Sequence, residues 1–360
     1  MTARTWKIVG INFDHGHMDG LVKMAREHPQ VSLEGVCDEQ PARMDGIVRS
    51  LGIPPEKVFT DYRACMETTR PDIAILCPAT AQHAEWTEKV APFGAHVIVE
   101  KPFAATLGEA DRMISAVART GKLLAINWPL RWYPVHVTTM RLIEEGTIGQ
   151  PWEVHYYDGN RGPAALMPEV FGSPLSPAAT WKDKHWFYRK ADGGGSLLDY
   201  LGYGTTLGTW FLRGAAPLEI TASAAGRPGL EVDEHAVVIA RYATGLSKYE
   251  TRWGAFTSPW EKQPQPKCGF VVVGSEGTIS SYDYEASVRV QTRAREEGFD
   301  VPVDVPAAPL RNPIEYLIDC LEKGRPVEGP LSPAIARIGQ QIVDGARESI
   351  RKRRPVRLPR

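Results

Sequence analysis

Short apolar runs alternate with amphipathic stretches over the first third of the chain. Apolar runs at 7–11, 32–38, 58–59, 72–77, 96–99 and 123–127 predict strands. Stretches at 19–27, 42–50, 63–68, 83–93 and 107–120 predict the intervening helices. Because the runs are apolar throughout and a helix separates each pair, they predict a doubly wound parallel sheet that is buried on both faces.

The pattern changes near Trp128-Pro129. A helix is predicted at 135–145, and strands then dominate, at 152–158, 219–224, 235–242, 246–253, 269–273 and 277–282. A long amphipathic helix at 333–352 ends the pattern. We therefore predict an α/β chain of two domains, 1–128 and 129–360. The second is an α+β domain with a large, open, mostly antiparallel sheet, whose final helix can pack back on the first domain.

Composition narrows the class of protein. The 360 residues are 43% hydrophobic, which is enough apolar content for two domain cores. The net charge is −1, so no nucleic-acid partner is predicted. Five scattered cysteines form no C-x-x-C pair, so neither a disulfide framework nor a zinc site is predicted. No stretch has transmembrane length, so no membrane partner is expected. A reducing cytoplasm is the expected location.

Glu100-Lys101-Pro102 directly follows the apolar run at 96–99. A strand there delivers a carboxylate and an amine to the carboxyl end of the sheet, where open α/β sheets bind ligands. Pro102 disfavours helix at Lys101, so an extended turn is expected. A lysine so placed can donate to a substrate hydroxyl and shuttle its proton. The alternative is an ordinary surface turn.

The turn after the first predicted strand contains the residues Gly10, Asn12, Phe13, His15, Gly16 and His17. Compared with the dinucleotide fingerprint G-x-G-x-x-G, Gly10 matches, whereas Asn12 and His15 replace the other glycines. Asparagine tolerates positive φ, and N–H groups at the start of the following helix can bind a pyrophosphate. Asp38 follows the second predicted strand, and no arginine is adjacent to it. We therefore expect its carboxylate to accept hydrogen bonds from ribose hydroxyls, which favours NAD over NADP.

His15 and His17 are two residues apart in this turn, a spacing seen in some metal sites. No third ligand is evident in the sequence, so no metal site is predicted. We expect the two histidines to line the phosphate or nicotinamide pocket, or to satisfy local backbone groups.

Gly193-Gly194-Gly195 precedes a stretch of helical spacing that begins at Ser196, a candidate N-cap. Asp199 and Tyr203 are four residues apart and so share one helix face. An acid and a phenol aimed at one place can bind and deprotonate a sugar hydroxyl. The alternative is a first-turn carboxylate favoured by the helix dipole, with a core tyrosine.

Residues Lys184, Trp186 and Arg189 lie just before the glycine run. Their mixture of cationic and aromatic side chains suits carbohydrate binding, and a solvated loop is the alternative interpretation.

Glu100-Lys101-Pro102, together with the glycine run and Asp199, makes the chain resemble the glucose–fructose oxidoreductase, inositol dehydrogenase and rhizopine catabolism (Gfo/Idh/MocA) oxidoreductases. The resemblance covers essentially the whole chain. Tyr203 stands where the family's D-x-G-x-H pattern has histidine, as in the glucose–fructose oxidoreductase branch. The family's P-N-x-x-H is altered to the segment from Pro78 to His83.

The resemblance implies that 1–128 is a dinucleotide-binding Rossmann domain and 129–360 a substrate-binding and oligomerisation domain. A nicotinamide cofactor would lie between them, and the open sheet would form a homodimer or homotetramer. The implied further cofactor contacts are Pro78, Ala79, His83, Glu100, Lys101, Asn127 and Arg131. The substrate contacts would include Lys101, Arg131, Asp199 and Tyr203.

The leading hypothesis is an NAD-dependent oxidoreductase that oxidises a secondary hydroxyl of a sugar, polyol or sugar derivative, or reduces the ketone. Lys101 or Tyr203 would take the hydroxyl proton, and Asp199 would fix the substrate. One alternative is a redox-neutral enzyme with tightly bound NAD, either glycosidase-like or passing hydride between two sugars. Another is a non-catalytic dinucleotide-binding sensor, which would not need these three residues.

Overall fold

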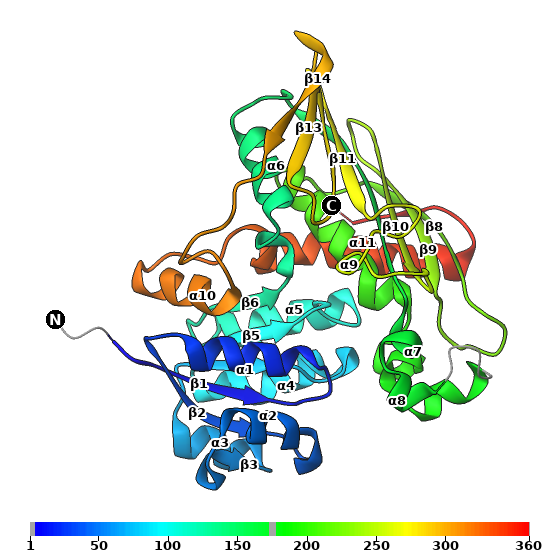
Figure 1. Cartoon of the computed structure of the whole chain (residues 1–360). Coiled ribbons are helices and arrows are strands. Elements are labelled where there is room, and N and C mark those ends of the chain that lie inside the picture. Colours follow the sequence, from blue (N-terminus) through cyan, green and yellow to red (C-terminus); the bar gives the residue numbers. More distant parts are fainter. Residues whose placement is uncertain (1–3, 173–177, 360) are drawn as a thin grey trace. The chain divides into compact units, whose positions relative to one another are not determined.

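The computed structural model describes residues 4–172 and 178–359 (Figure 1). The chain divides into two compact units, Met1–Pro129 with Ala307–Pro333, and Leu130–Pro306 with Ala334–Arg360. The segment 307–333 therefore groups with the first unit, although its place in the sequence assigned it to the second domain.

The first unit is built on a parallel sheet of six strands in the order β3-β2-β1-β4-β5-β6. The strands are β1 (Trp6–Ile11), β2 (Val31–Cys37), β3 (Val58–Phe59), β4 (Ile73–Leu76), β5 (His96–Glu100) and β6 (Leu124–Asn127). The helices are α1 (His17–Glu27), α2 (Asp45–Leu51), α3 (Tyr62–Thr69), α4 (His83–Val90), α5 (Leu107–Ala118) and α10 (Pro313–Glu322). This strand order starts at the centre and runs to both edges, which confirms the doubly wound sheet.

Helix α1 packs so closely on the sheet that residue 10, the first glycine of the turn after β1, has little room for a side chain. A Cβ on Gly10 would lie 3.0 Å from Val22 and 3.1 Å from Met18, both on α1. Helix α10, from the far end of the sequence, packs beside α1 (Figure 1). There the Gln30 side chain donates a hydrogen bond to Glu322 at 2.8 Å.

The second unit contains a nine-stranded sheet in the order β14-β13-β12-β11-β7-β10-β9-β8-β15. The strands are β7 (Pro151–Asn160), β8 (Glu219–Ala225), β9 (His235–Arg241), β10 (Leu246–Trp253), β11 (Gly269–Gly274), β12 (Gly277–Tyr282), β13 (Ser287–Thr292), β14 (Arg295–Pro302) and β15 (Val356–Arg357). The helices are α6 (Pro134–Glu144), α7 (Pro163–Leu166), α8 (Pro168–Phe171), α9 (Ser196–Phe211) and α11 (Pro333–Lys352). Only β7 and β10 pair in parallel, so the mostly antiparallel sheet is confirmed.

Helix α9 lies against one face of this sheet, and glycines make the approach possible. A Cβ on Gly204 would overlap the ring of Tyr156 on β7, and one on Gly208 would overlap Tyr249 on β10. On the opposite face, Ile239 and Val271 are 42% and 37% exposed in the single chain. Strand register places both in one row that crosses the sheet from β9 to β12.

All five cysteines are free and buried. The apolar surroundings of Cys37 and Cys77 predicted burial for those two. Within residues 4–172 and 178–359, no helix combines the length and the apolar character needed to cross a membrane.

Candidate functional site

The turn between β1 and α1 has the conformation that the fingerprint requires. Asn12 has a φ of +69°, so it takes the left-handed backbone usually left to glycine. Its N–H donates to the Cys37 carbonyl at 2.9 Å, which ties the turn to the end of β2. The Asn12 side chain is buried, and its Oδ1 has no hydrogen-bond partner among the described residues. That oxygen is therefore available to a ligand in the turn.

Asp38 organises the same turn from the end of β2. Its Oδ2 accepts the Phe13 N–H and its Oδ1 the Gln40 N–H, each at 2.7 Å. A carboxylate has lone pairs left for ribose hydroxyls beyond these two bonds. The expectation that no arginine lies beside Asp38 was wrong. Arg43 comes within 3.5 Å of its Oδ1, and also pairs with Asp14 at 2.7 Å.

Glu100, at the end of β5, makes polar contacts with residues from several segments. It is fully buried, its Oε1 lies 2.8 Å from His17 Nδ1, and its Oε2 accepts the Asn127 side-chain amide at 2.7 Å. Burial opposes ionisation, but His17, the charge of Lys101 and the Asn127 hydrogen bond outweigh it and hold the pKa of Glu100 below its usual range. Glu100 therefore stays ionised beside Lys101.

Glu100 also supplies the third group that the sequence did not reveal near the two histidines. His15, His17 and Glu100 each place one potential metal-ligand atom within 4.8 Å of the others. In the described geometry they hydrogen-bond to one another instead, since His15 Nδ1 accepts the His17 N–H at 3.2 Å and His17 meets Glu100.

Lys101 is only 4% exposed, so it is not the ordinary surface turn that was its alternative interpretation. The loops around it are tied together by His83, whose ring nitrogens lie 3.2 Å from the carbonyls of Pro78 and Phe103. Burial lowers the pKa of His83, so the neutral ring donates one hydrogen bond at a time. His83 thus holds the loop after β4, which includes Ala79, against the loop that contains Lys101.

The start of α9 differs from the expectation. Its N-cap is Gly195, with a φ of +104°, and Ser196 is the first helical residue. The N–H groups of Ser196 and Leu197 donate to the backbone and side-chain oxygens of Asp233, at 3.0 and 2.7 Å. A Cβ on Gly194 would overlap the backbone of Phe187. The glycines are therefore required by contacts within the protein, which no local pattern could show.

Asp199 and Tyr203 lie on the first two turns of α9, and both are buried. Helical spacing puts them on one face. The ring of Tyr203 lies 5.0 Å from that of Tyr200. Arg131, a further predicted contact, ends a short turn of 3₁₀ helix at Pro129–Arg131.

The predicted carbohydrate contacts before the glycine run have partners within the protein. Lys184 Nζ donates to the Phe171 carbonyl at 3.2 Å, and Arg189 pairs with Asp192. Trp186 is buried. Their role toward substrate stays a prediction.

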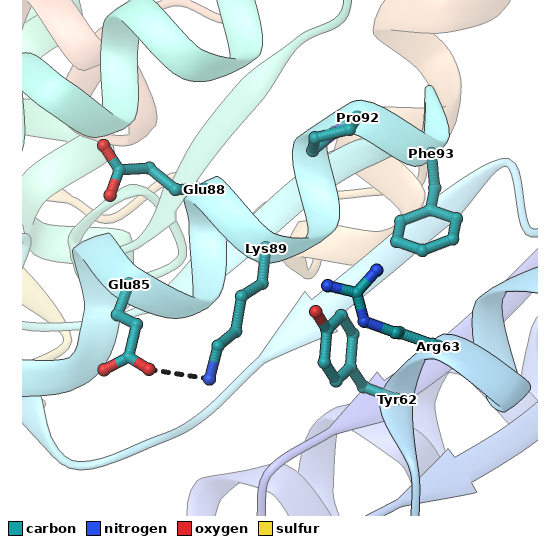
Figure 2. A pocket seen from close by; sticks show the side chains of 7 residues that line it. All are labelled: Tyr62, Arg63, Glu85, Glu88, Lys89, Pro92 and Phe93. Atoms are coloured by element: carbon teal, nitrogen blue, oxygen red, sulfur yellow. Dashed lines mark ion pairs between the residues drawn. The ribbon is translucent and has the colours of Figure 1, made fainter.

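A separate surface groove of about 450 Å³ lies on the first unit, between α3 and α4 (Figure 2). It is lined by Tyr62, Arg63, Glu85, Glu88, Lys89, Pro92 and Phe93. Lys89 pairs with Glu85 at 2.6 Å and Glu88 with Arg112 at 2.9 Å. None of the predicted site residues lines this groove, so we assign it no part in the chemistry.

Comparison with known proteins finds a matching family model for each of the two units. A family model described as an oxidoreductase family with an NAD-binding Rossmann fold matches residues 5–128. A model of the GFO/IDH/MocA C-terminal domain matches residues 136–280. The two cover more than half of the chain and define an NAD-binding oxidoreductase. The chain belongs to the Gfo/Idh/MocA family.

Curated relatives include a D-apiose dehydrogenase from Paraburkholderia graminis, 28% identical over 127 residues, which are 35% of this chain and 33% of that protein. An inositol 2-dehydrogenase from Salmonella typhimurium is 27% identical over 160 residues, 44% of this chain and 47% of that protein. The match thus spans between a third and a half of these relatives.

Among solved structures, an oxidoreductase from Agrobacterium radiobacter in complex with NAD+, L-tartaric acid and magnesium has a TM-score of 0.76 at 17% identity. The likeness covers 98% of both chains and shows a shared fold.

Proposed function

We propose that the protein is an NAD-dependent oxidoreductase that acts on a secondary hydroxyl of a sugar, polyol or sugar derivative. The observation that carries this proposal is the buried Lys101, placed at the carboxyl end of β5 next to an ionised Glu100. A buried ammonium beside a fixed carboxylate suits a group that must hold and release a proton at one position. The sugar and polyol dehydrogenases among the relatives support the substrate class.

The residues of the first unit fit a nicotinamide dinucleotide. Asn12 supplies the glycine-like turn and an unpartnered side-chain oxygen, and Asp38 supplies a carboxylate for ribose hydroxyls. The N-terminus of α1 offers backbone N–H groups to a pyrophosphate. When bound, the dinucleotide supplies the acceptor for a hydride.

The chain's own residues hold the substrate and move its proton. Tyr203, or Lys101 once it has lost its own proton, accepts the proton of the reacting hydroxyl, and Asp199 accepts a hydrogen bond from the substrate and so orients it. In the reverse direction the same groups donate a proton to the forming alcohol.

We further propose that a second copy of the chain covers the open face of the large sheet, in a homodimer or homotetramer. The exposed Ile239 and Val271 support this, since exposed apolar side chains on a sheet face favour pairing. Five free cysteines fit a reducing compartment such as the cytoplasm.

The test is a panel of sugars and polyols with NAD or NADP, followed by the absorbance of the reduced cofactor. We expect turnover with at least one compound, and a higher kcat/KM with NAD because Asp38 repels a 2′-phosphate. Asp38→Ala should reduce that preference, whereas Arg43→Ala should leave it in place. A clear preference for NADP would instead assign Arg43 to the phosphate, and no reduction by either cofactor would reject the function.

A further inference from the structure

Two aspartates and a histidine are buried together in the second unit, beside the candidate catalytic helix α9. We call Asp158, Asp283 and His136 the acid cluster. Asp158 lies on β7, Asp283 follows β12, and His136 lies on α6. Asp158 and Asp283 are each 4% exposed, and His136 is fully buried. No sequence pattern indicates the cluster, because its members come from three distant segments.

The contacts of the acid cluster leave several polar atoms without a hydrogen bond. Asp158 Oδ2 accepts the Tyr156 hydroxyl at 2.8 Å, and His136 Nε2 lies 3.4 Å from Asp283 Oδ1. Yet Asp158 Oδ1, Asp283 Oδ1 and His136 Nε2 all lack a hydrogen bond among the described residues. Two buried carboxylates with open lone pairs are costly unless one of them is neutral.

Burial and then the charge of Asp283 raise the pKa of Asp158 to about 7, while the Tyr156 hydrogen bond opposes the shift. Asp158 therefore gains or loses its proton near neutral pH.

Tyrosines interact with both the acid cluster and Tyr203. Burial, and then the charge of Asp158, strongly raise the pKa of Tyr200, whose ring lies 5.0 Å from that of Tyr203. Burial also raises the pKa of Tyr133, and the neighbouring Tyr284, Tyr203 and Asp283 add to that rise. The Tyr284 hydroxyl donates to Tyr133 at 3.3 Å, and Tyr284 is 52% exposed, so this pair extends toward solvent.

We propose that the Asp158–Asp283 pair is the proton acceptor behind Tyr203, taking up the proton that leaves the substrate hydroxyl and later releasing it to solvent by way of Tyr133 and Tyr284. The inference rests on the proposed function for its role in turnover. The step breaks the substrate O–H bond and forms an O–H bond on the pair, with a tyrosine hydroxyl as carrier. The proton alone moves, and no protein group changes its oxidation state. Asp158 and Asp283 are positioning residues, since they act through the tyrosines.

The titratable groups that face Asp158 and Asp283 set the pH dependence. They are Tyr156 and Tyr157 of β7, Tyr200 of α9, Cys268 before β11, Tyr284 after β12, and Tyr133 and His136 at the start of α6. Below about pH 7 Asp158 is protonated and cannot accept a proton. The kcat of the wild type should therefore fall as the pH drops through this range.

Infrared spectroscopy tests the proton directly, through the carbonyl stretch of a protonated carboxyl group. The wild-type protein should show a band that titrates near pH 7 and is missing from Asp158→Asn. Because burial also raises the pKa of Asp233 to about 6, that residue contributes its own band, and the difference between wild type and variant isolates Asp158. Asp283→Asn removes the like charge, so the band should titrate at lower pH even if Asp158→Asn fails to fold.

Measurements of kcat across the pH range distinguish a positioning role of Asp158 and Asp283 from a loss of structure in the variants. Asp158→Asn should lower kcat at pH 7 on the order of tenfold, less than the loss of a group that touches substrate, and abolish the acidic limb of the profile. Asp283→Asn should move that limb to lower pH. Asp300→Asn, exposed on β14, should leave the band and profile unchanged. Absence of the band from the wild type, or its persistence in Asp158→Asn, would overturn the inference; a normal band without any turnover would reject the proposed function instead.

Discussion

Replacing Lys101 by methionine is expected to lower kcat by at least about a hundredfold, within the usual range for a lost general acid–base group. Methionine keeps the length and apolar stem of the side chain but cannot hold a proton. The loss should come with little change in dinucleotide affinity, because the turn formed by Asn12 and Asp38 does not depend on Lys101. Steady-state kinetics and calorimetric titration with NAD measure the two effects.

Lys23→Met is the matched control, since Lys23 lies exposed on α1 in the same unit. It should keep wild-type turnover. Near-normal turnover in a folded Lys101→Met protein would remove Lys101 from the proton-transfer step and leave Tyr203 as the candidate.

Tyr203→Phe should lower kcat by roughly a hundredfold while KM changes little, if the phenol accepts the hydroxyl proton. The variant retains the ring that packs against Tyr200 and loses only the hydroxyl. The pH–rate profile of the wild type should contain an ionisation that disappears in the variant. Measuring kcat and KM across the pH range tests both statements.

Tyr282→Phe, on an exposed position of β12, is the control for loss of a phenol and should behave as wild type. An unchanged profile with kcat nearly retained in Tyr203→Phe would make Tyr203 a packing or substrate-contact residue, with Lys101 as the sole proton-transfer group.

Strong apolar patterns allowed most of the fold to be predicted. The buried strands of the first unit read as continuous apolar runs, and α11 was predicted with its observed bounds of Pro333–Lys352. Strand β14 was missed because it carries Arg295, Glu296 and Glu297 on an exposed edge, without apolar alternation. Helix α10 was missed although its polar residues Glu315, Asp319 and Glu322 recur at helical spacing in an apolar stretch.

Only those features of the candidate site that depend on residue type or on spacing within one segment could be predicted. The left-handed conformation of Asn12 followed from its residue type, and the shared face of Asp199 and Tyr203 from their spacing. The approach of Arg43 to Asp38 depends on how the chain folds after β2, and the cap that Asp233 gives α9 comes from a distant segment. Such contacts between segments leave no pattern in either segment alone.

The most direct test of the central claim is transfer of deuterium from a substrate labelled at the carbon that bears the reacting hydroxyl. The account predicts that mass spectrometry finds one deuterium in each molecule of reduced nicotinamide cofactor, and that wild-type turnover slows with the labelled substrate when hydride transfer limits the rate. Reduced cofactor that carries no deuterium, or substrate consumed with its label retained at that carbon, would contradict hydride transfer from a secondary alcohol.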